Sequence, residues 1–219
     1  MRNDPDYERH YVVLEEELRD IRKKHCGDML QRISPGFSLE TIHDIGHAKL
    51  IKHSRSASIY THRSSGRDFV KLVADMPHPI EKVLAAVIDP ANYPRWNDQV
   101  GTGRVNIRIP SENALVASQK HQGVGRGREF VYLRHLFQKN GVIYLVDKSI
   151  EHASVPSDRQ VLRGEIKLAL WAFEPIGLNC TRLICMADMD FKIKAFGGGS
   201  VAEPTVSYLM ATAALSNYL

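Results

Sequence analysis

Apolar side chains recur every three or four positions near the amino terminus, at Tyr7, Tyr11, Leu14, Leu18 and Ile21. Charged residues separate them, and this period predicts an amphipathic helix over residues 6–25. A second helix is predicted over residues 80–88, where Pro79 suits the first turn. A short helical turn is expected at 93–97, and a last helix begins near Pro204.

The remaining pattern is that of short strands separated by turns. Four segments rich in Ile, Val, Tyr and Thr are divided by Gly and Ser, over residues 38–45, 48–53, 57–62 and 67–75. Six more strands are predicted after residue 100, over about 103–109, 114–120, 128–138, 141–151, 161–173 and 181–193. Nine or so mostly antiparallel strands make a sheet that is large enough to curl.

A curled sheet with long apolar strands needs an element across its open side, and the last predicted helix suits that place. Its small residues can lie close over a cavity without filling it: Ala211, Thr212, Ala213, Ala214 and Ser216. The sequence therefore predicts an α+β fold. A curled antiparallel sheet of about nine strands carries two short helices, and a C-terminal helix closes an internal cavity.

The length of 219 residues allows one domain or at most two. We expect a single domain over residues 35–219, with residues 1–34 as an N-terminal helical segment of the same domain. No uncharged apolar run approaches the roughly 18–20 residues of a bilayer span, and no secretory signal is visible. We therefore expect a cytoplasmic protein.

The net charge of +4 is weak and scattered, without a basic stripe interleaved with aromatic residues. It does not indicate a nucleic-acid partner, and it is compatible with transient visits to an anionic membrane surface. The three cysteines, Cys26, Cys180 and Cys185, form no Cys-x-x-Cys pair. They are expected to be reduced thiols, and no metal site is predicted.

Three features suggest chemistry and have a simpler structural explanation. His43 and His47 have the spacing of a zinc-binding helix but fall in a predicted hairpin. The glycines at 123, 125 and 127 lead into a strand, whereas a phosphate loop leads into a helix. His152 has no nucleophile and orienting acid that the sequence can pair with it. No catalytic residue and no cofactor is predicted.

Several ordered motifs resemble the START domain family (steroidogenic acute regulatory protein-related lipid transfer), which has the helix-grip fold. They are Pro79-x3-Val83-x3-Val87-x-Asp89, Tyr93-x-x-Trp96-Asn97, Arg128-Glu-Phe-Val, Ser149-Ile-Glu-His152 with Pro156 and Val161-Leu-Arg163, and Asp190-Phe-Lys. The resemblance covers about residue 35 to the end. It implies that one lipid is bound inside the curled sheet, under the C-terminal helix. Candidate lipid-binding residues are Arg134, Arg128, Ser118, Gln119, Tyr132, His152, Trp171, Leu209 and Met210.

Strand alternation places Arg134 on one face with Phe130 and Tyr132. The alternation does not say whether this face is inward, so an exposed Arg134 stays open. The sterol-binding branch of the resembled family pairs such an arginine with a Glu on the preceding strand. Here that strand offers only Ser118 or Gln119. An inward Arg134 would then keep its positive charge, which favours a phospholipid or fatty acid over a sterol.

The predicted function is lipid binding and transfer without bond chemistry. The protein would contact membranes peripherally and transiently while the C-terminal helix or a neighbouring loop opens. Two alternatives remain: a cyclase- or hydrolase-like enzyme of the helix-grip superfamily that acts on an apolar substrate, and a lipid-sensing regulatory module.

Overall fold

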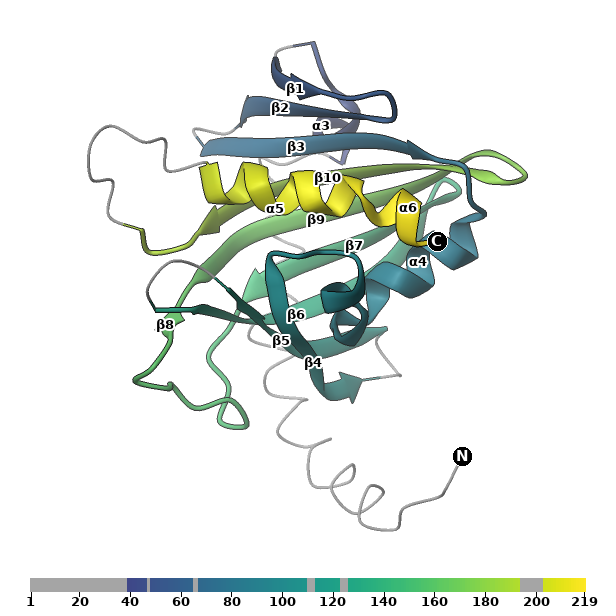
Figure 1. Cartoon of the computed structure of the whole chain (residues 1–219). Helices are drawn as coiled ribbons and strands as arrows, with labels where there is room; N and C mark the ends of the chain where they lie inside the picture. The colour runs from purple at the N-terminus through teal and green to yellow at the C-terminus, as the bar shows by residue number, and fades with distance from the viewer. Residues whose placement is uncertain (1–38, 47, 65–66, 110–112, 123–125, 194–202) are drawn as a thin grey trace.

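The computed structural model describes residues 39–46, 48–64, 67–109, 113–122, 126–193 and 203–219. Its main element is one curled sheet in the order β1-β2-β3-β10-β9-β7-β6-β5-β4, with antiparallel neighbours throughout (Figure 1). The strands are β1 (Lys49–His53), β2 (Ala57–Ser64), β3 (Arg67–Met76), β4 (Val100–Ile109), β5 (Ala114–His121), β6 (Arg128–Lys139), β7 (Val142–Ser149), β9 (Glu165–Gly177) and β10 (Cys180–Asp190). The two-residue β8 (Leu162–Arg163) pairs in parallel with the start of β6.

Five helical elements accompany the sheet within the described residues: α3 (Glu40–His43), α4 (Ile80–Ile88), the 3-10 helix η2 (Pro90–Arg95), α5 (Glu203–Ala213) and α6 (Leu215–Tyr218). Figure 1 shows α5 lying along β3 and β10, with α4 and η2 beside it on the same side of the sheet. The predicted fold class, an α+β fold with a curled antiparallel sheet, two short helices and a C-terminal helix, is confirmed.

One predicted strand is wrong. Residues 38–45 were expected to be extended, but their described part contains the short helix α3. The ammonium group of Lys71 donates to the carbonyls of Asp44 and Thr41 at the end of this helix, at 2.6 and 3.4 Å. Ile42 is completely buried on the outer face of the sheet, so a tertiary contact fixes the turn of helix. The predicted helix at 6–25 lies outside the described residues.

Both faces of the sheet are apolar. On the inner face, Phe130 and Tyr132 of β6 join a core with α4, η2 and α5. On the outer face, Val131 and Leu133 of the same strand join a cluster with residues of β4 and β5. This alternation decides which side chains of each strand can reach an internal site.

We call one end of the sheet the hairpin end. It is defined by the turns at 54–56, 140–141 and 178–179 and by the pair Ile109–Ala114, where β4 meets β5. The register places these connections together, since β7 Ile143 pairs with β9 Phe173 and β10 Thr181 pairs with β3 Met76. The connection from β10 to α5 leaves from the opposite end.

Candidate functional site

A buried ion pair lies on the inner face. Arg134 of β6 and Asp147 of β7 are direct cross-strand neighbours, and both side chains are almost completely buried. The Nε and Nη2 atoms of Arg134 donate to Oδ1 and Oδ2 of Asp147 at 2.7 and 2.6 Å. This two-pronged geometry is the strongest arrangement of an arginine with a carboxylate.

The third nitrogen of the guanidinium is also satisfied by the protein. Nη1 of Arg134 donates to the carbonyl of Val87 at 2.6 Å and to that of Ile88 at 3.3 Å. These two carbonyls end helix α4, where the helix dipole is negative. Helix α4 is thus tied to the inner face of β6 through one cation.

Aromatic rings surround the pair. The guanidinium carbon of Arg134 lies 5.7, 5.4 and 6.0 Å from the rings of Tyr93, Tyr132 and Trp171. The indole Nε1 of Trp171 donates to Oδ2 of Asp147 at 3.1 Å. Burial by itself lowers the pKa of Arg134, but the charge of Asp147, its hydrogen bonds and the nearby Tyr93 and Tyr132 together raise the pKa well above its usual value. Arg134 therefore stays charged.

The expectation that Arg134 has only Ser118 or Gln119 as a polar neighbour is wrong. The acid comes from β7, the strand after β6, whereas the sequence comparison considered only the strand before it. Ser118 is two positions after Val116 in β5, so it lies on the outer face with Val116, opposite to Ala117. Gln119 points inward, but it contacts His121 at 2.9 Å and Tyr132 at 3.4 Å.

A pocket of about 190 Å³ opens next to the pair, between the end of α4 and strands β4 to β7. Its apolar walls come from Ile88, Leu115, Leu136 and Leu145. Buried Arg134 lines one side, while exposed Arg108 and Asn113 line the other. The pocket therefore leads from the surface at the hairpin end to the buried ion pair.

The other predicted site residues divide into two groups. Tyr132 and Trp171 lie beside Arg134, as described above. Leu209 of α5 is buried and Met210 is half-buried against the inner core. Arg128 lies at the opposite end of β6, where its Nε donates to the carbonyl of Phe191 at 3.0 Å. His152 lies outside the sheet strands and is 2.7 Å from the hydroxyl of Ser154, so it is not part of the pocket.

His121 belongs to the inner face and was missed by the sequence analysis. Its ring lies 5.0, 5.3 and 5.3 Å from those of Phe130, Phe191 and Tyr208, so it forms an aromatic cluster under α5. Burial lowers its pKa from 6.5 to about 3. The alternation of β5 could have identified it, since His121 is in phase with inward-facing Leu115 and Ala117.

Polar bonds fasten the C-terminal helices. The amide nitrogen of Asn97 donates to the carbonyl of Tyr208 at 3.3 Å and to the hydroxyl of Thr212 at 3.4 Å. His78 contacts the carbonyl of Ser216 at 3.3 Å, and the ammonium of Lys82 donates to the carbonyl of Leu219. Helix α5 is thus held to the loop after η2, and α6 to α4.

Within the described ranges, no three His, Cys, Asp or Glu side chains gather in an arrangement that could hold a metal ion. The ring of His43 contacts Glu174 at 2.6 Å and the hydroxyl of Tyr144 at 3.1 Å. The glycines at 123 and 125 lie outside the described residues, as does His47. None of the helices in the described part of the chain has the length and hydropathy needed to span a membrane.

Comparison with known proteins identifies one family. The model of the START domain matches residues 44–195. Human StAR-related lipid transfer protein 5 has a similar structure, with a TM-score of 0.71 and 15% identity, over 93% of this chain and 97% of that chain. The structure of human STARD10 has a TM-score of 0.68 and 14% identity, over 81% of this chain and 73% of that chain. At these identities the two structures show the fold alone.

Curated relatives of this chain are much longer proteins. StAR-related lipid transfer protein 9 of Homo sapiens is 26% identical over 125 residues, which is 54% of this chain and 3% of that protein. Its counterpart from Mus musculus is 25% identical over the same shares. The match therefore concerns one domain of those proteins.

Proposed function

The chain belongs to the START domain family, and we propose that it binds one lipid between the curled sheet and α5 and carries it between membranes. One observation supports this most directly: a buried, charge-balanced polar group lies at the end of an apolar pocket that opens to the surface. A few fixed polar groups in an apolar cavity are typical of sites that orient an amphipathic ligand.

The ion pair changes the lipid class that we propose. The preference for a phospholipid or fatty acid rested on an Arg134 without an acid, and Asp147 removes that argument. The charges of the pair cancel, so an anionic headgroup would bring a third, uncompensated charge into a buried site. We propose a lipid with an uncharged hydroxyl headgroup, such as a sterol, with its hydroxyl at the Arg134 side of the pocket.

Binding of a whole lipid requires α5 to move. The pocket of about 190 Å³ is smaller than the ~300–1,000 Å³ that ligand cavities usually have. The space under α5 is filled by Tyr208, Leu209 and Phe191. Two of the four buried residues of α5 are threonines, so only Tyr208 and Leu209 are fully buried apolar side chains of this helix. This supports α5 as the element that opens.

The enzyme alternative needs an acid or base that is free to exchange a proton. Behind Arg134, which lines the pocket, both oxygens of Asp147 accept hydrogen bonds from Arg134, and one also accepts from Trp171. Proton transfer by Asp147 would leave Arg134 buried without a counter-charge. The pair therefore suits binding better than catalysis, and we propose that the lipid leaves unchanged.

Native mass spectrometry of the purified protein, followed by vesicle transfer assays, tests this function. We expect a co-purified lipid of unaltered mass and accelerated transfer of a fluorescent sterol. Leu136→Trp should block both, because Leu136 lines the pocket. Phe137→Trp is the matched control, since the next residue of β6 packs on the outer face. Absence of transfer for sterol, phospholipid, ceramide and fatty-acid probes would contradict the proposal.

A further inference from the structure

The turn between β9 and β10 projects beyond the rest of the sheet. The last pair of β9 with β7 is Phe173–Ile143, and the first of β10 with β3 is Thr181–Met76. The chain from one of these residues to the other forms a hairpin that extends past both neighbouring strands, as Figure 1 shows at the right of the view. Such a hairpin can reach a surface that the body of the sheet does not touch.

The tip of this hairpin is apolar. Residues 175–179 read Pro-Ile-Gly-Leu-Asn and contain no charged side chain. Leu178 is 97% exposed and Ile176 is 44% exposed. A single exposed leucine is common on protein surfaces. Here, however, two large aliphatic side chains are exposed together at the tip of a protruding hairpin, where the rest of the described chain does not cover them.

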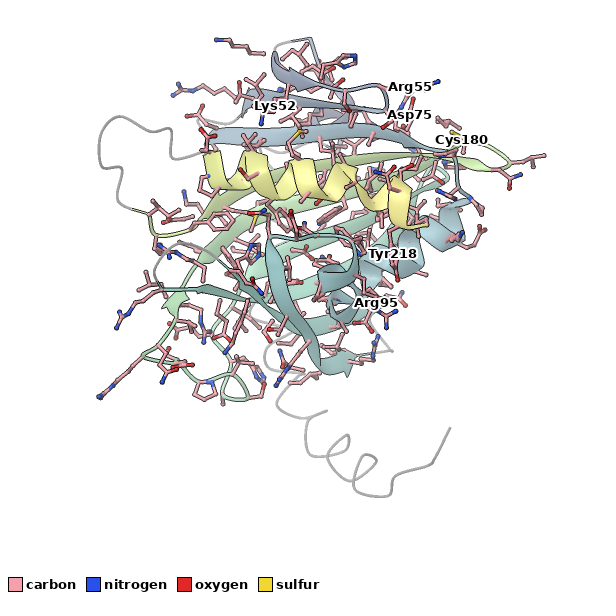
Figure 2. All side chains as sticks on the ribbon, in the orientation of Figure 1. Lys52, Arg55, Asp75, Arg95, Cys180 and Tyr218 are labelled. Atoms are coloured by element: carbon pink, nitrogen blue, oxygen red, sulfur yellow. The ribbon has the colours of Figure 1, made fainter. Side chains whose placement is uncertain are left out.

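An exposed tyrosine lies at the same end of the molecule as the tip. The hydroxyl of Thr181 donates to the carbonyl of His78 at 2.8 Å, and His78 in turn contacts α6, which places half-exposed Tyr218 at the same end of the molecule (Figure 2). Tyrosine is enriched where proteins meet the headgroup region of a bilayer.

Basic side chains accompany the apolar tip. Arg55 in the turn between β1 and β2 and Lys139 at the end of β6 are exposed at the hairpin end. Among the acids of this end, Asp75 is engaged by Arg182 through two bonds of 2.7 and 2.9 Å, and Glu174 next to the tip contacts His43 at 2.6 Å. Two exposed cations therefore lie at the end that carries the tip, and an anionic surface is attracted to them.

We propose that the tip of the β9–β10 hairpin inserts Ile176 and Leu178 into the headgroup region of an anionic membrane, with Arg55 and Lys139 on the lipid phosphates. This inference rests on the proposed function and extends it, because it names the element that touches the membrane. The pocket mouth at Arg108 and Asn113 belongs to the same end of the sheet. Docking in this orientation directs the pocket toward the bilayer.

Flotation with vesicles tests the contact. The full chain is mixed with vesicles of phosphatidylcholine alone or with phosphatidylserine added, and the bound fraction is measured. We expect tighter binding to the anionic vesicles. Leu178→Asp should weaken it about tenfold or more, because a leucine side chain leaving water contributes more than the roughly 1.4 kcal/mol that corresponds to tenfold. Ile193→Asp is the matched control, since Ile193 is 47% exposed at the opposite end.

A fluorescent variant reports insertion directly. In Leu178→Trp the new indole is exposed, whereas native Trp96 and Trp171 are buried. Anionic vesicles should shift its emission to the blue, and brominated lipid should quench it, while Ile193→Trp should remain unchanged. Unshifted emission, or equal losses in Leu178→Asp and Ile193→Asp, would overturn the proposal and favour a protein partner for the tip.

The outcome is separable from that of the proposed function. Native mass spectrometry without vesicles measures lipid retention in each variant, and thermal unfolding confirms that the variants fold. Leu178→Asp should retain its lipid while losing vesicle binding. If the wild-type chain holds no lipid but Leu178→Asp still loses vesicle binding, the lipid-carrier function fails and the membrane contact stands.

Discussion

At the scale of single residues, the inner face depends on charge compensation between neighbouring strands. The alternation of β6 was sufficient to group Arg134 with Phe130 and Tyr132, and the structure places all three on the inner face. The position of Asp147 could not be obtained in the same way. It depends on the register between β6 and β7, which is fixed by the turn at Asn140–Gly141, where both residues have positive φ angles.

The pair predicts an asymmetry between single and double substitutions. Arg134→Leu leaves Asp147 buried without a counter-charge, so the free energy of unfolding should fall by about 3–5 kcal/mol. Arg134→Leu combined with Asp147→Leu should recover much of this loss and still fail to bind the lipid headgroup. Urea unfolding of the wild type and three variants measures the coupling. Additive losses in the double variant would mean that the pair is not coupled in the folded protein.

His121 predicts a loss of stability in acid. Burial lowers its folded pKa from 6.5 to about 3, so the unfolded chain binds more protons between these values. The contribution of neutral His121 to the free energy of unfolding is complete above pH 6.5 and is lost as the pH falls toward 3. From pH 7 to pH 5 the expected loss is about 2 kcal/mol. Since His121 contacts Tyr208 of α5, protonation should also loosen that helix.

The matched variant for this effect is His121→Phe, which keeps an aromatic ring but does not titrate. Denaturant unfolding at pH 7 and pH 5 gives the change in the free energy of unfolding for each protein. The difference between the wild-type change and the variant change is the contribution of His121. Tyr208, which faces it from α5, has a pKa well above its usual value because of burial and stays neutral over this range. An equal pH dependence in both proteins would show that His121 is not buried in neutral form.

At the scale of elements, local sequence predicts long strands well. It predicts poorly the short elements that depend on contacts with distant parts of the chain. The strands from β2 to β10, apart from the two-residue β8, are rich in apolar residues and bounded by turns, and their predicted positions differ from the structure mainly at the ends. Helix α3 has only four residues, and its end is fixed by Lys71, which lies 27 residues after Asp44. The motif Tyr93-x-x-Trp96-Asn97 indicated a helical turn, but the contact of Asn97 with α5 required the folded chain.

The bond from Asn97 to α5 predicts a variant with a looser lid. Asn97→Ala removes the donor to the Tyr208 carbonyl and the Thr212 hydroxyl. The free energy that holds α5 in place should fall by about 1 kcal/mol. We expect faster lipid exchange and little change in global stability. Asn92→Ala is the control, because the amide of half-buried Asn92 donates to the carbonyl of Ala85 within the α4–η2 region. Deletion of residues 204–219 should abolish lipid retention altogether.

The rate at which a fluorescent lipid passes from the protein into acceptor vesicles measures how readily α5 opens. Asn97→Ala should exchange several-fold faster than the wild type, since about 1.4 kcal/mol corresponds to tenfold. Equal rates for Asn97→Ala and Asn92→Ala, or unchanged lipid retention after the deletion, would show that α5 is not the element that opens.

At the scale of the whole molecule, a sheet that is apolar on both faces needs cover on both. The curled sheet and its C-terminal helix were predictable, because strand number and helix composition are local properties. The position of the pocket was not, because it depends on how α4 meets β4 to β7. On the outer face, Val116, Val131 and Leu133 are completely buried, with Ile150 and Val155 in the same cluster.

The predicted amphipathic helix at 6–25 supplies an apolar stripe of the kind that an outer sheet face requires, so residues 1–34 are predicted to belong to the same folding unit. Their deletion should lower the free energy of unfolding by about 3 kcal/mol or more, because each aliphatic side chain returned to water costs about 1.5–3 kcal/mol. Binding of a hydrophobic dye should increase. Leu14→Asp with Leu18→Asp should reproduce both effects, since these residues belong to the apolar stripe, whereas Glu16→Gln, on the charged side, should not. If the shortened chain unfolds at the same denaturant concentration as the full one, residues 1–34 are a separate segment and do not cover the outer face.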